Sequence, residues 1–415
     1  MHIALGGIGT AFADANFRRY SVGAIISWLS FFIQTVAVAW LTWDLTHSTT
    51  WLAVIALLDA VPMSVLAPLG GIIADRHDRF RILMVAYSFA TLQAALLAAL
   101  AFSGTLTIER LGALTLLHGL VHAFSVPAQF GLLPRFVARD RLPSAIAVAS
   151  AYSNLGFFLG PALAGWVILH FGVGVAFASN VVGYGIYFWS AALLQRLPED
   201  KPPIASNRSI ARDFIEGVQT IVGHRGIRAL LALMTLGDAL AAAVRQMLPA
   251  FSDRIFHSGV QGLSALLAGA GAGATLAALW LAQGGMRRVT STRIIWAFLG
   301  FLAATLVLLT AGGLSMAVAA MVARGFCFEI CRTALVALLQ TSVSDAVRGR
   351  IMSTQFLLQQ GARAAGVATI GWAATDWGLR GPLFWGVLLA ALVWSAAFWS
   401  RHAVNAAFTV STTVP

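Results

Sequence analysis

The chain has 415 residues, of which 59% are hydrophobic and only 10% are charged. A soluble globule of this length needs more polar residues to cover its surface, so the composition excludes an ordinary soluble domain and indicates a membrane protein. The formal net charge of +11 does not indicate nucleic-acid binding, because the basic residues are distributed over loops between long apolar segments.

Twelve apolar segments follow one another along the chain, each long enough to cross a hydrocarbon layer of ~30 Å, which takes ~20 residues of helix. Residues 142–195 are free of charge and long enough for two helices, so we expect them to turn back at Phe171 to Val175, whose sequence is FGVGV. The expected spans are residues 20–43, 51–74, 81–102, 109–133, 144–170, 174–195, 227–250, 261–283, 293–311, 314–338, 350–374 and 381–401.

Basic residues are distributed unequally between the two sets of loops. Of the 27 Lys and Arg residues, four lie within spans and three (Arg110, Arg254 and Arg380) lie in odd-numbered loops, which leaves twenty in the amino-terminal segment, the even-numbered loops and the carboxy-terminal segment. Because cytoplasmic loops carry the excess of Lys and Arg, this distribution predicts a multi-pass protein of the bacterial inner membrane with both termini in the cytoplasm.

The chain contains an internal repeat. At an offset of 206 residues, Val137 matches Val343 and Gly160 matches Gly366. Such a repeat predicts two six-helix halves, as in transporters whose halves rock about a central site. We therefore expect an N-terminal half at 1–195, a cytoplasmic linker with an amphipathic helix at 196–226, a C-terminal half at 227–402 and a cytoplasmic tail at 403–415.

Several motifs carry a resemblance to a known family. The segment from Gly70 to Arg81, GGIIADRHDRFR, places five charges in a short turn between two apolar segments, and its pattern Gly-x-x-x-Asp-Arg-x-x-Arg-x-Arg resembles the loop between helices two and three of the major facilitator superfamily. The run GPALAGW resembles the helix-five motif of the antiporter branch. The segments PAQFGLLPRFV and SDAVRGRIMS resemble the subgroup of bacterial exporters that includes the enterobactin exporter.

The resemblance implies the major facilitator fold, an all-α membrane protein with twelve transmembrane helices in two pseudo-symmetric six-helix halves. It also implies a conformational switch at Asp75, whose carboxylate at the membrane edge could accept from the free N–H groups at the start of helix eleven. A loop that only anchors the topology is the alternative. The switch residues are Gly71, Asp75, Arg76 and Arg79, and the helix-packing motif comprises Gly156, Gly160, Pro161 and Gly165.

Charged residues within the spans are candidates for function, because each costs a few kcal/mol to insert. We expect proton coupling at Asp238 and Glu329 ahead of Asp59, since the first two lie on helices seven and ten, which line the cavity in transporters of this resemblance. Glu329 is three residues from Arg332, so a permanent ion pair is the alternative. Further candidates for the wall of the substrate cavity are Arg245, Arg324, Arg332, His118, His122 and Gln34.

These features predict a secondary active transporter that exports a small amphiphilic or anionic compound, siderophore or drug-like, by proton antiport with alternating access. The alternatives are an uptake symporter or lysolipid flippase of the same fold, or a non-transporting membrane receptor. No Gly-x-x-x-x-Gly-Lys-Ser/Thr loop occurs, and we expect no enzymatic activity. We expect no cofactor and no metal, and as partners a small-molecule substrate, protons and the lipid bilayer, with no nucleic acid and a monomeric chain.

Overall fold

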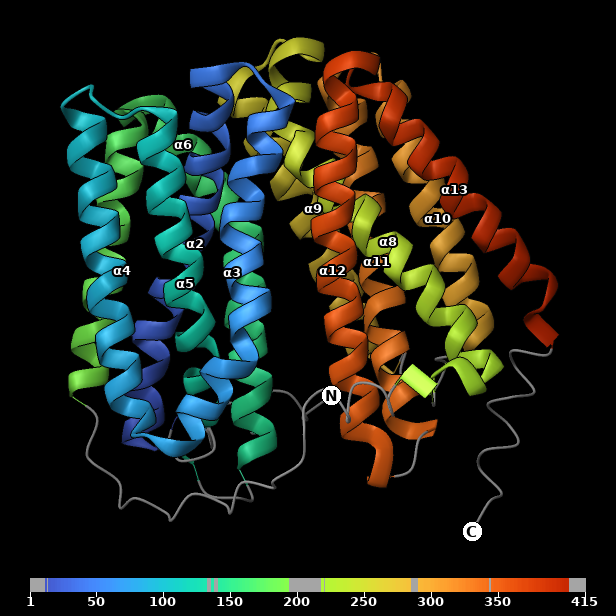
Figure 1. Ribbon diagram of the computed structural model, residues 1–415, viewed down its shortest axis with the longest axis horizontal. Coiled ribbons are helices and arrows are strands. Elements are labelled where there is room, and N and C mark those ends of the chain that lie inside the picture. The colour runs from blue at the N-terminus through green and yellow to red at the C-terminus, as the bar shows by residue number, and fades with distance from the viewer. Residues whose placement is uncertain are drawn as a thin grey trace. The chain divides into compact units, whose positions relative to one another are not determined.

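The computed structural model describes residues 12, 14–132, 136–137, 141–193, 218–219, 221–284, 290–342 and 345–402, without the side chains of residues 67–68, 75, 130–131, 143, 147, 150, 153–154, 225, 282, 341–342 and 345–350. The expected tail at 403–415 and most of the expected linker at 196–226, including its amphipathic helix, lie outside the described residues. Within the described part every regular element is a helix, as the composition predicts (Figure 1).

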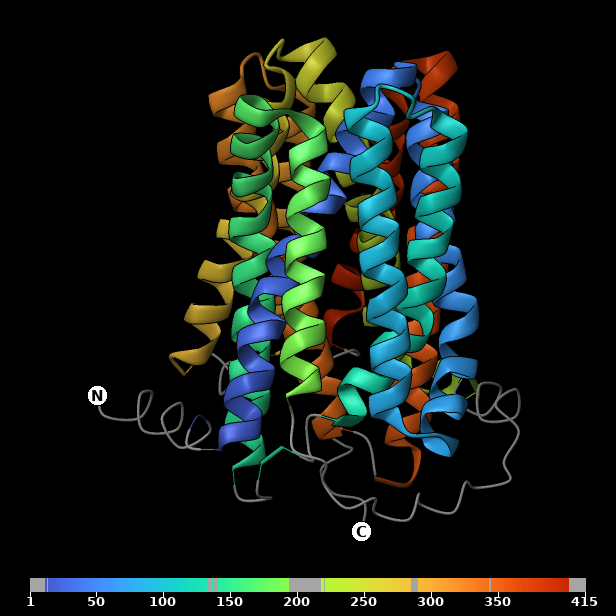
Figure 2. The same ribbon diagram turned by 90° about the vertical axis from the view of Figure 1, so that its left-hand side faces the viewer.

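The chain forms two compact units. Unit 1 comprises Met1–His47 and Val54–Ala205, and unit 2 comprises Ser48–Ala53 and Ser206–Pro415. Within each unit the helices run side by side along most of their length, as Figures 1 and 2 show. Each unit is therefore a helical bundle with its own core.

Unit 1 contains α2 (Ala15–Thr46), α3 (Thr49–Arg76) from Val54 onward, α4 (Arg79–Phe102), α5 (Ile108–Leu132) and α6 (Leu142–Ala192). α6 is interrupted at Gly172, whose φ of 82° and ψ of 170° are not helical. Glycine accepts this positive φ without the steric cost that a Cβ adds. The turn predicted at Phe171 to Val175 is thus present, and α6 supplies two of the expected spans.

The core of unit 1 is rich in tyrosine. α6 packs against α2 and α4, and α5 packs against both α2 and α4. All five tyrosines of the chain are buried in this core, and the rings of Tyr87 and Tyr187 are 4.1 Å apart between centroids. Gln129 donates to the Tyr187 hydroxyl at 3.3 Å. The tyrosines are Tyr20, Tyr87, Tyr152, Tyr184 and Tyr187.

Unit 2 contains α8 (Arg225–Ala250), the short π-helix η2 (Phe251–Ile255), α9 (Gly259–Ala282), α10 (Ser291–Thr310), α11 (Leu314–Ser342), α12 (Asp345–Trp377) and α13 (Arg380–Trp399). Its helices pair as those of unit 1 do. α12 packs on α8 as α6 packs on α2, and α10 packs on α11 as α4 packs on α5. The repeat seen in the sequence is therefore also a repeat of helix packing.

Ten of the described helical stretches are long and apolar enough to cross a membrane. The long stretch Leu155–Ala192 counts once among them although it spans both parts of α6. α12 is not among the ten, because Gln355, Gln359 and Arg363 lie along it. When α6 is counted as two helices, the described residues contain the twelve long helices that the sequence predicts.

Candidate functional site

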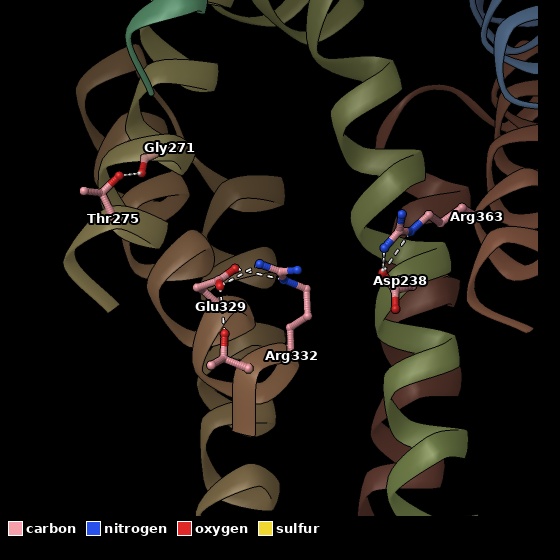
Figure 3. Close-up of polar contacts among 7 residues, drawn as sticks. Asp238, Gly271, Thr275, Glu329, Arg332 and Arg363 are labelled. Carbon is pink, nitrogen blue, oxygen red and sulfur yellow. Dashed lines mark hydrogen bonds and ion pairs between the residues drawn. The ribbon is translucent and has the colours of Figure 1, made fainter. Parts of the chain in front are cut away.

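An ion pair joins α8 and α12 within unit 2. Arg363 of α12 donates from Nε and Nη2 to Oδ1 of Asp238, at 3.0 and 2.8 Å (Figure 3). Asp238 lies near the middle of α8, and its side chain is 2% accessible. Its second oxygen, Oδ2, has no hydrogen-bond partner among the described residues. The carboxylate is therefore bound by one arginine through Oδ1, and Oδ2 can accept a further hydrogen bond.

A second ion pair lies within α11. Arg332 donates from Nε to Glu329 Oε2 at 3.0 Å and from Nη2 to Oε1 at 2.7 Å, and Thr333 donates to Oε1 at 2.8 Å (Figure 3). This is the pair that the spacing of three residues allows. Arg332 nevertheless leaves 46% of its side chain accessible, so its remaining donors can reach another molecule.

Arg324 of α11 is a buried cation. Its side chain is 5% accessible, its Nε donates to Thr305 Oγ1 at 3.2 Å, and its guanidinium carbon lies 5.0 Å from the centroid of the Phe301 ring. Nη2 is buried without a hydrogen-bond partner, and no carboxylate is paired with this arginine in the described part of the chain. Desolvating a charge without an opposite charge costs several kcal/mol, so the site is suited to an anion.

Arg245 of α8 adds to this positive charge. It lies within electrostatic range of Asp238, Arg363 and Arg324. Its side chain is accessible to solvent. Away from the ends of its expected spans, the described part of unit 2 thus contains four arginines, the three cavity candidates and Arg363, against the two acids Asp238 and Glu329.

In unit 1 the structure brings together two predicted residues that the sequence did not connect. His118 Nδ1 of α5 lies 2.7 Å from Asp59 Oδ1 of α3. His122 lies one turn further along α5, with its ring tilted by 57° and its centroid 4.3 Å from that of His118. Phe31 of α2 lies against both imidazoles, at 5.8 and 5.3 Å. The two histidines therefore belong to one polar group with an acid, in which His118 is buried and Asp59 is partly accessible.

Gln34, a further cavity candidate, is buried between helices of unit 1. Its Nε2 donates to Gln93 Oε1 at 3.2 Å, and Gln93 Nε2 donates in turn to the carbonyl of Leu114 at 3.1 Å. This chain of hydrogen bonds joins α2, α4 and α5. Gln34 thus contributes to the packing of unit 1 in this structure.

The offset of 206 residues relates the two polar groups. At this offset His118 of α5 aligns with Arg324 of α11, and Gly119 aligns with Gly325. Both glycines admit a neighbouring backbone. A Cβ on Gly119 would lie 3.1 Å from the Cα of Asp59, and one on Gly325 would lie 3.1 Å from the Cα of Ala270. The same packing position thus carries a titratable side chain in unit 1 and a permanent cation in unit 2.

A family model described as transmembrane secretion effector matches residues 9–410. The chain belongs to this family of the major facilitator superfamily. Its relatives include the macrolide efflux protein A of Streptococcus pyogenes, 23% identical over 58% of this chain and 60% of the relative. The staphyloferrin A transporter of Staphylococcus aureus is 22% identical over 58% and 60% of the two chains. The enterobactin exporter EntS of Escherichia coli is 28% identical over 63% and 62%.

The chain spans about 60% of the length of these curated relatives. Solved structures show the fold over a larger share. The structure titled as a bacterial homologue of the human lysosomal transporter Spinster, inward-facing and unoccupied, matches with a TM-score of 0.70 and 12% identity over 95% of this chain and 97% of its own. The nucleoside transporter NupG matches with a TM-score of 0.68 and 13% identity over 97% and 100%. The predicted major facilitator fold is thus confirmed.

The loop that carries the family resemblance lies at the end of α3. The side chain of Asp75 lies outside the described residues, and Arg76 is exposed in the last helical turn. Arg79 donates from Nε to the carbonyl of Ala74 at 3.0 Å. A Cβ on Gly71 would meet nothing within 4 Å, whereas one on the adjacent glycine, Gly70, would collide with the carbonyl of Ala123. Close packing therefore requires a glycine at 70.

The predicted helix-packing motif lies where α6 meets α2. A Cβ on Gly156 would lie 3.2 Å from the Cβ of Trp28, and one on Gly160 would collide with the Cβ of Phe32. Pro161 and Gly165 are buried in the same helix. Small residues let helix backbones approach closely in membranes, and this contact joins the first and fifth helices of unit 1.

Proposed function

We propose that this chain is a secondary active transporter that exports a small amphiphilic or anionic compound from the cytoplasm in exchange for protons, by alternating access. The observation that carries the proposal is the surplus of arginine within the membrane-spanning helices of unit 2, above all Arg324, buried without a carboxylate partner among the described residues. A charge in the middle of a membrane helix is costly and marks a substrate or ion pathway. An anion that binds there offsets the cost.

The surroundings of Arg324 favour a ligand that is partly aromatic or aliphatic as well as anionic. The ring of Phe301 lies under the guanidinium, and the ring of Phe328 lies 5.1 Å from that of Phe301. Two of the relatives are named for siderophores and one for a macrolide. A siderophore or drug-like compound combines the polar and apolar groups that such a surface binds.

Direction, placement and switching belong to the same proposal. The family is described as a secretion effector, which supports export. The excess of arginine in the even-numbered loops supports placement in a bacterial inner membrane with both termini in the cytoplasm. We retain Asp75 with Arg76 and Arg79 as the switch, because this charged turn at the end of α3 joins two membrane helices.

Proteoliposomes test the proposal directly. Purified protein is reconstituted, and uptake of a labelled macrolide, staphyloferrin A and enterobactin is measured with the lumen acidified relative to the outside. Because an antiporter releases a proton for each movement of cargo, we expect the gradient to accelerate accumulation of at least one compound several-fold. A protonophore should abolish this acceleration, and protein-free liposomes should show none.

The same assay separates the alternatives. Accumulation driven by a gradient of the opposite sign would indicate a proton symporter. Movement of a labelled lysolipid alone would indicate a flippase, and saturable binding without accumulation would indicate a receptor. Transport that ignores the pH gradient would contradict proton antiport and indicate facilitated diffusion or another driving ion.

A further inference from the structure

The group formed by Asp59, His118 and His122 in unit 1 is the second concentration of charge within the membrane helices. Asp59 lies in α3 and both histidines lie one turn apart on α5, so the group forms where these two helices meet. Gly119 makes the contact possible, because a side chain there would collide with the backbone of Asp59. The 2.7 Å contact between His118 Nδ1 and Asp59 Oδ1 is therefore set by the packing of α3 on α5.

The carboxylate of this group is reachable from solvent. The side chain of Asp59 is 41% accessible, against 8% for His118. The exposed apolar residues nearest to Asp59 along α3, Val61 and Val65, lie about 160° and 120° around the helix from it at 3.6 residues per turn, whereas Leu69 and Ile73 near the end of the helix lie within about 80°. At its own level of the helix, the carboxylate thus points away from the exposed apolar side chains of α3.

A carboxylate paired with histidine differs from one paired with arginine in the net charge of the pair before and after a proton binds. An arginine stays charged at all physiological pH values, so the Asp238–Arg363 pair has no net charge and would become a buried cation if a proton bound to Asp238. The pair of Asp59 with a neutral His118 carries one negative charge. Uptake of one proton makes it neutral, which is the less costly state away from water. Ordinary histidine titrates at about pH 6.5.

The imidazoles leave room for that proton. With Nδ1 of His118 directed at the carboxylate, Nε2 is the free position, and it is buried without a partner in the described part of the chain. Nε2 of His122 is buried and unpaired in the same way. Phe31 holds both rings from α2. The titratable groups within electrostatic range of Asp59 include both histidines and, from α6, the hydroxyl of Tyr184.

Two plainer roles are less compatible with these contacts. A metal site needs a further ligand, and no group of three His, Cys, Asp or Glu residues that could hold an ion occurs among the described residues. A purely structural pair would be expected to be shielded from solvent on both sides, whereas Asp59 is accessible. The repeat adds a third argument, since the position of His118 is occupied in unit 2 by Arg324, which cannot release a proton.

We propose that Asp59 and His118, with His122 beside them, form the site in unit 1 that binds and releases the exchanged proton, while the arginines of unit 2 bind the anionic part of the cargo. The inference rests on the proposed antiport function and assigns its two ligands to different units. A proton from water enters on the side where the Asp59 carboxylate is accessible and is held by the Asp59–His118 pair, and the reverse step returns it to water.

Proton uptake by the purified protein tests this site without any cargo. The detergent-solubilised protein is titrated from pH 8 to pH 5, and bound protons are counted for the wild type, Asp59→Asn and His118→Gln. We expect each variant to take up about one proton fewer than the wild type, since a buried imidazole stays neutral without its carboxylate. The double variant should lose no more than either single variant, because the two residues act as one group.

Matched controls exclude trivial explanations. Asp44→Asn removes an exposed acid at the end of α2 and should leave the uptake unchanged, while unfolding temperatures show that each variant is folded. If Asp59→Asn binds as many protons as the wild type, the assigned site is wrong, whatever the transport assay shows. If the uptake is lost but transport ignores the pH gradient, the proton site stands and the antiport function fails.

Discussion

At the scale of single residues, unit 2 contains two arginines whose surroundings differ in one respect. Arg363 is paired with Asp238, which is buried, through two hydrogen bonds. Arg324 is itself buried, is paired with no carboxylate among the described residues, and has one nitrogen without a partner. Removing the first leaves a buried carboxylate uncompensated, whereas removing the second relieves an uncompensated cation. The two side chains should therefore differ in sign in their effect on stability.

We predict that Arg363→Gln destabilises the empty protein by about 3 kcal/mol, the cost of breaking a buried pair, and lowers its unfolding temperature. Arg324→Gln should leave the unfolding temperature unchanged or raise it. Thermal unfolding in detergent, followed by circular dichroism, measures both.

Arg324 should matter for cargo binding although it does not stabilise the empty protein. Arg324→Gln should weaken binding of an anionic cargo by about 1–3 kcal/mol, the contribution of a charged hydrogen bond, while binding of an uncharged analogue changes little. Equilibrium binding of the compound that the reconstituted protein transports, compared with its neutral ester, makes the comparison. Equal losses for both ligands would show that Arg324 shapes the site without contacting the anion.

At the scale of helices, the sequence predicts most of the fold because its signals are local. A charge-free run of about 20 residues is read directly as a span, and the glycine-containing turn that divides α6 was predicted at its observed place, Gly172. The Glu329–Arg332 pair was also predictable, because residues three apart on one helix are neighbours. Such features need no knowledge of which helices touch.

The polar group of unit 1 could not be found in this way. Asp59 and His118 are 59 residues apart in the chain, and their contact depends on the packing of α3 against α5, which spacing along the chain does not reveal. The sequence analysis places Asp59 after Asp238 and Glu329 as a proton candidate, because the helix of Asp59 is not expected to line the cavity. The sequence does contain one signal. At the offset of the repeat, His118-Gly119 corresponds to Arg324-Gly325, so an ionisable residue precedes a glycine in both halves.

The contact of α6 with α2 gives a prediction at the same scale. Gly160→Ala should destabilise unit 1 by about 1–3 kcal/mol, as overpacking does, because the new methyl group would collide with the Cβ of Phe32. Gly185→Ala in the second part of α6 is the matched control, since a Cβ there meets nothing within 4 Å. The control should be neutral or stabilising by up to ~1 kcal/mol, the gain in helix propensity. Equal effects on the unfolding temperature would contradict close packing at Gly160.

At the scale of the whole molecule, the two units present different chemistry on the same arrangement of helices. The first and fifth helices pack together in both, α2 with α6 and α8 with α12, and a glycine of the fourth helix admits the second in both. On this shared framework unit 1 carries an acid with two histidines and unit 2 carries the surplus of arginine. A transporter that exchanges a proton for an anion needs both kinds of site, and the duplication supplies a separate framework for each.

The orientation of the chain in the membrane decides in which direction the proposed antiport would move its cargo. Because twenty of the 27 basic residues lie in the terminal segments and even-numbered loops, the positive-inside rule predicts that the connection between the halves is cytoplasmic and that the connection between α8 and α9 is external. Alkaline phosphatase, which is active only outside the cytoplasm, should be inactive when fused after Ile204 and active when fused after Ser258, and a cytoplasmic reporter should show the reverse. The same pattern should persist in Asp59→Asn, which changes no loop charge. If both reporters gave the opposite result, the arginine-rich loops would face outward, and a compound exchanged for incoming protons could not be assigned to export.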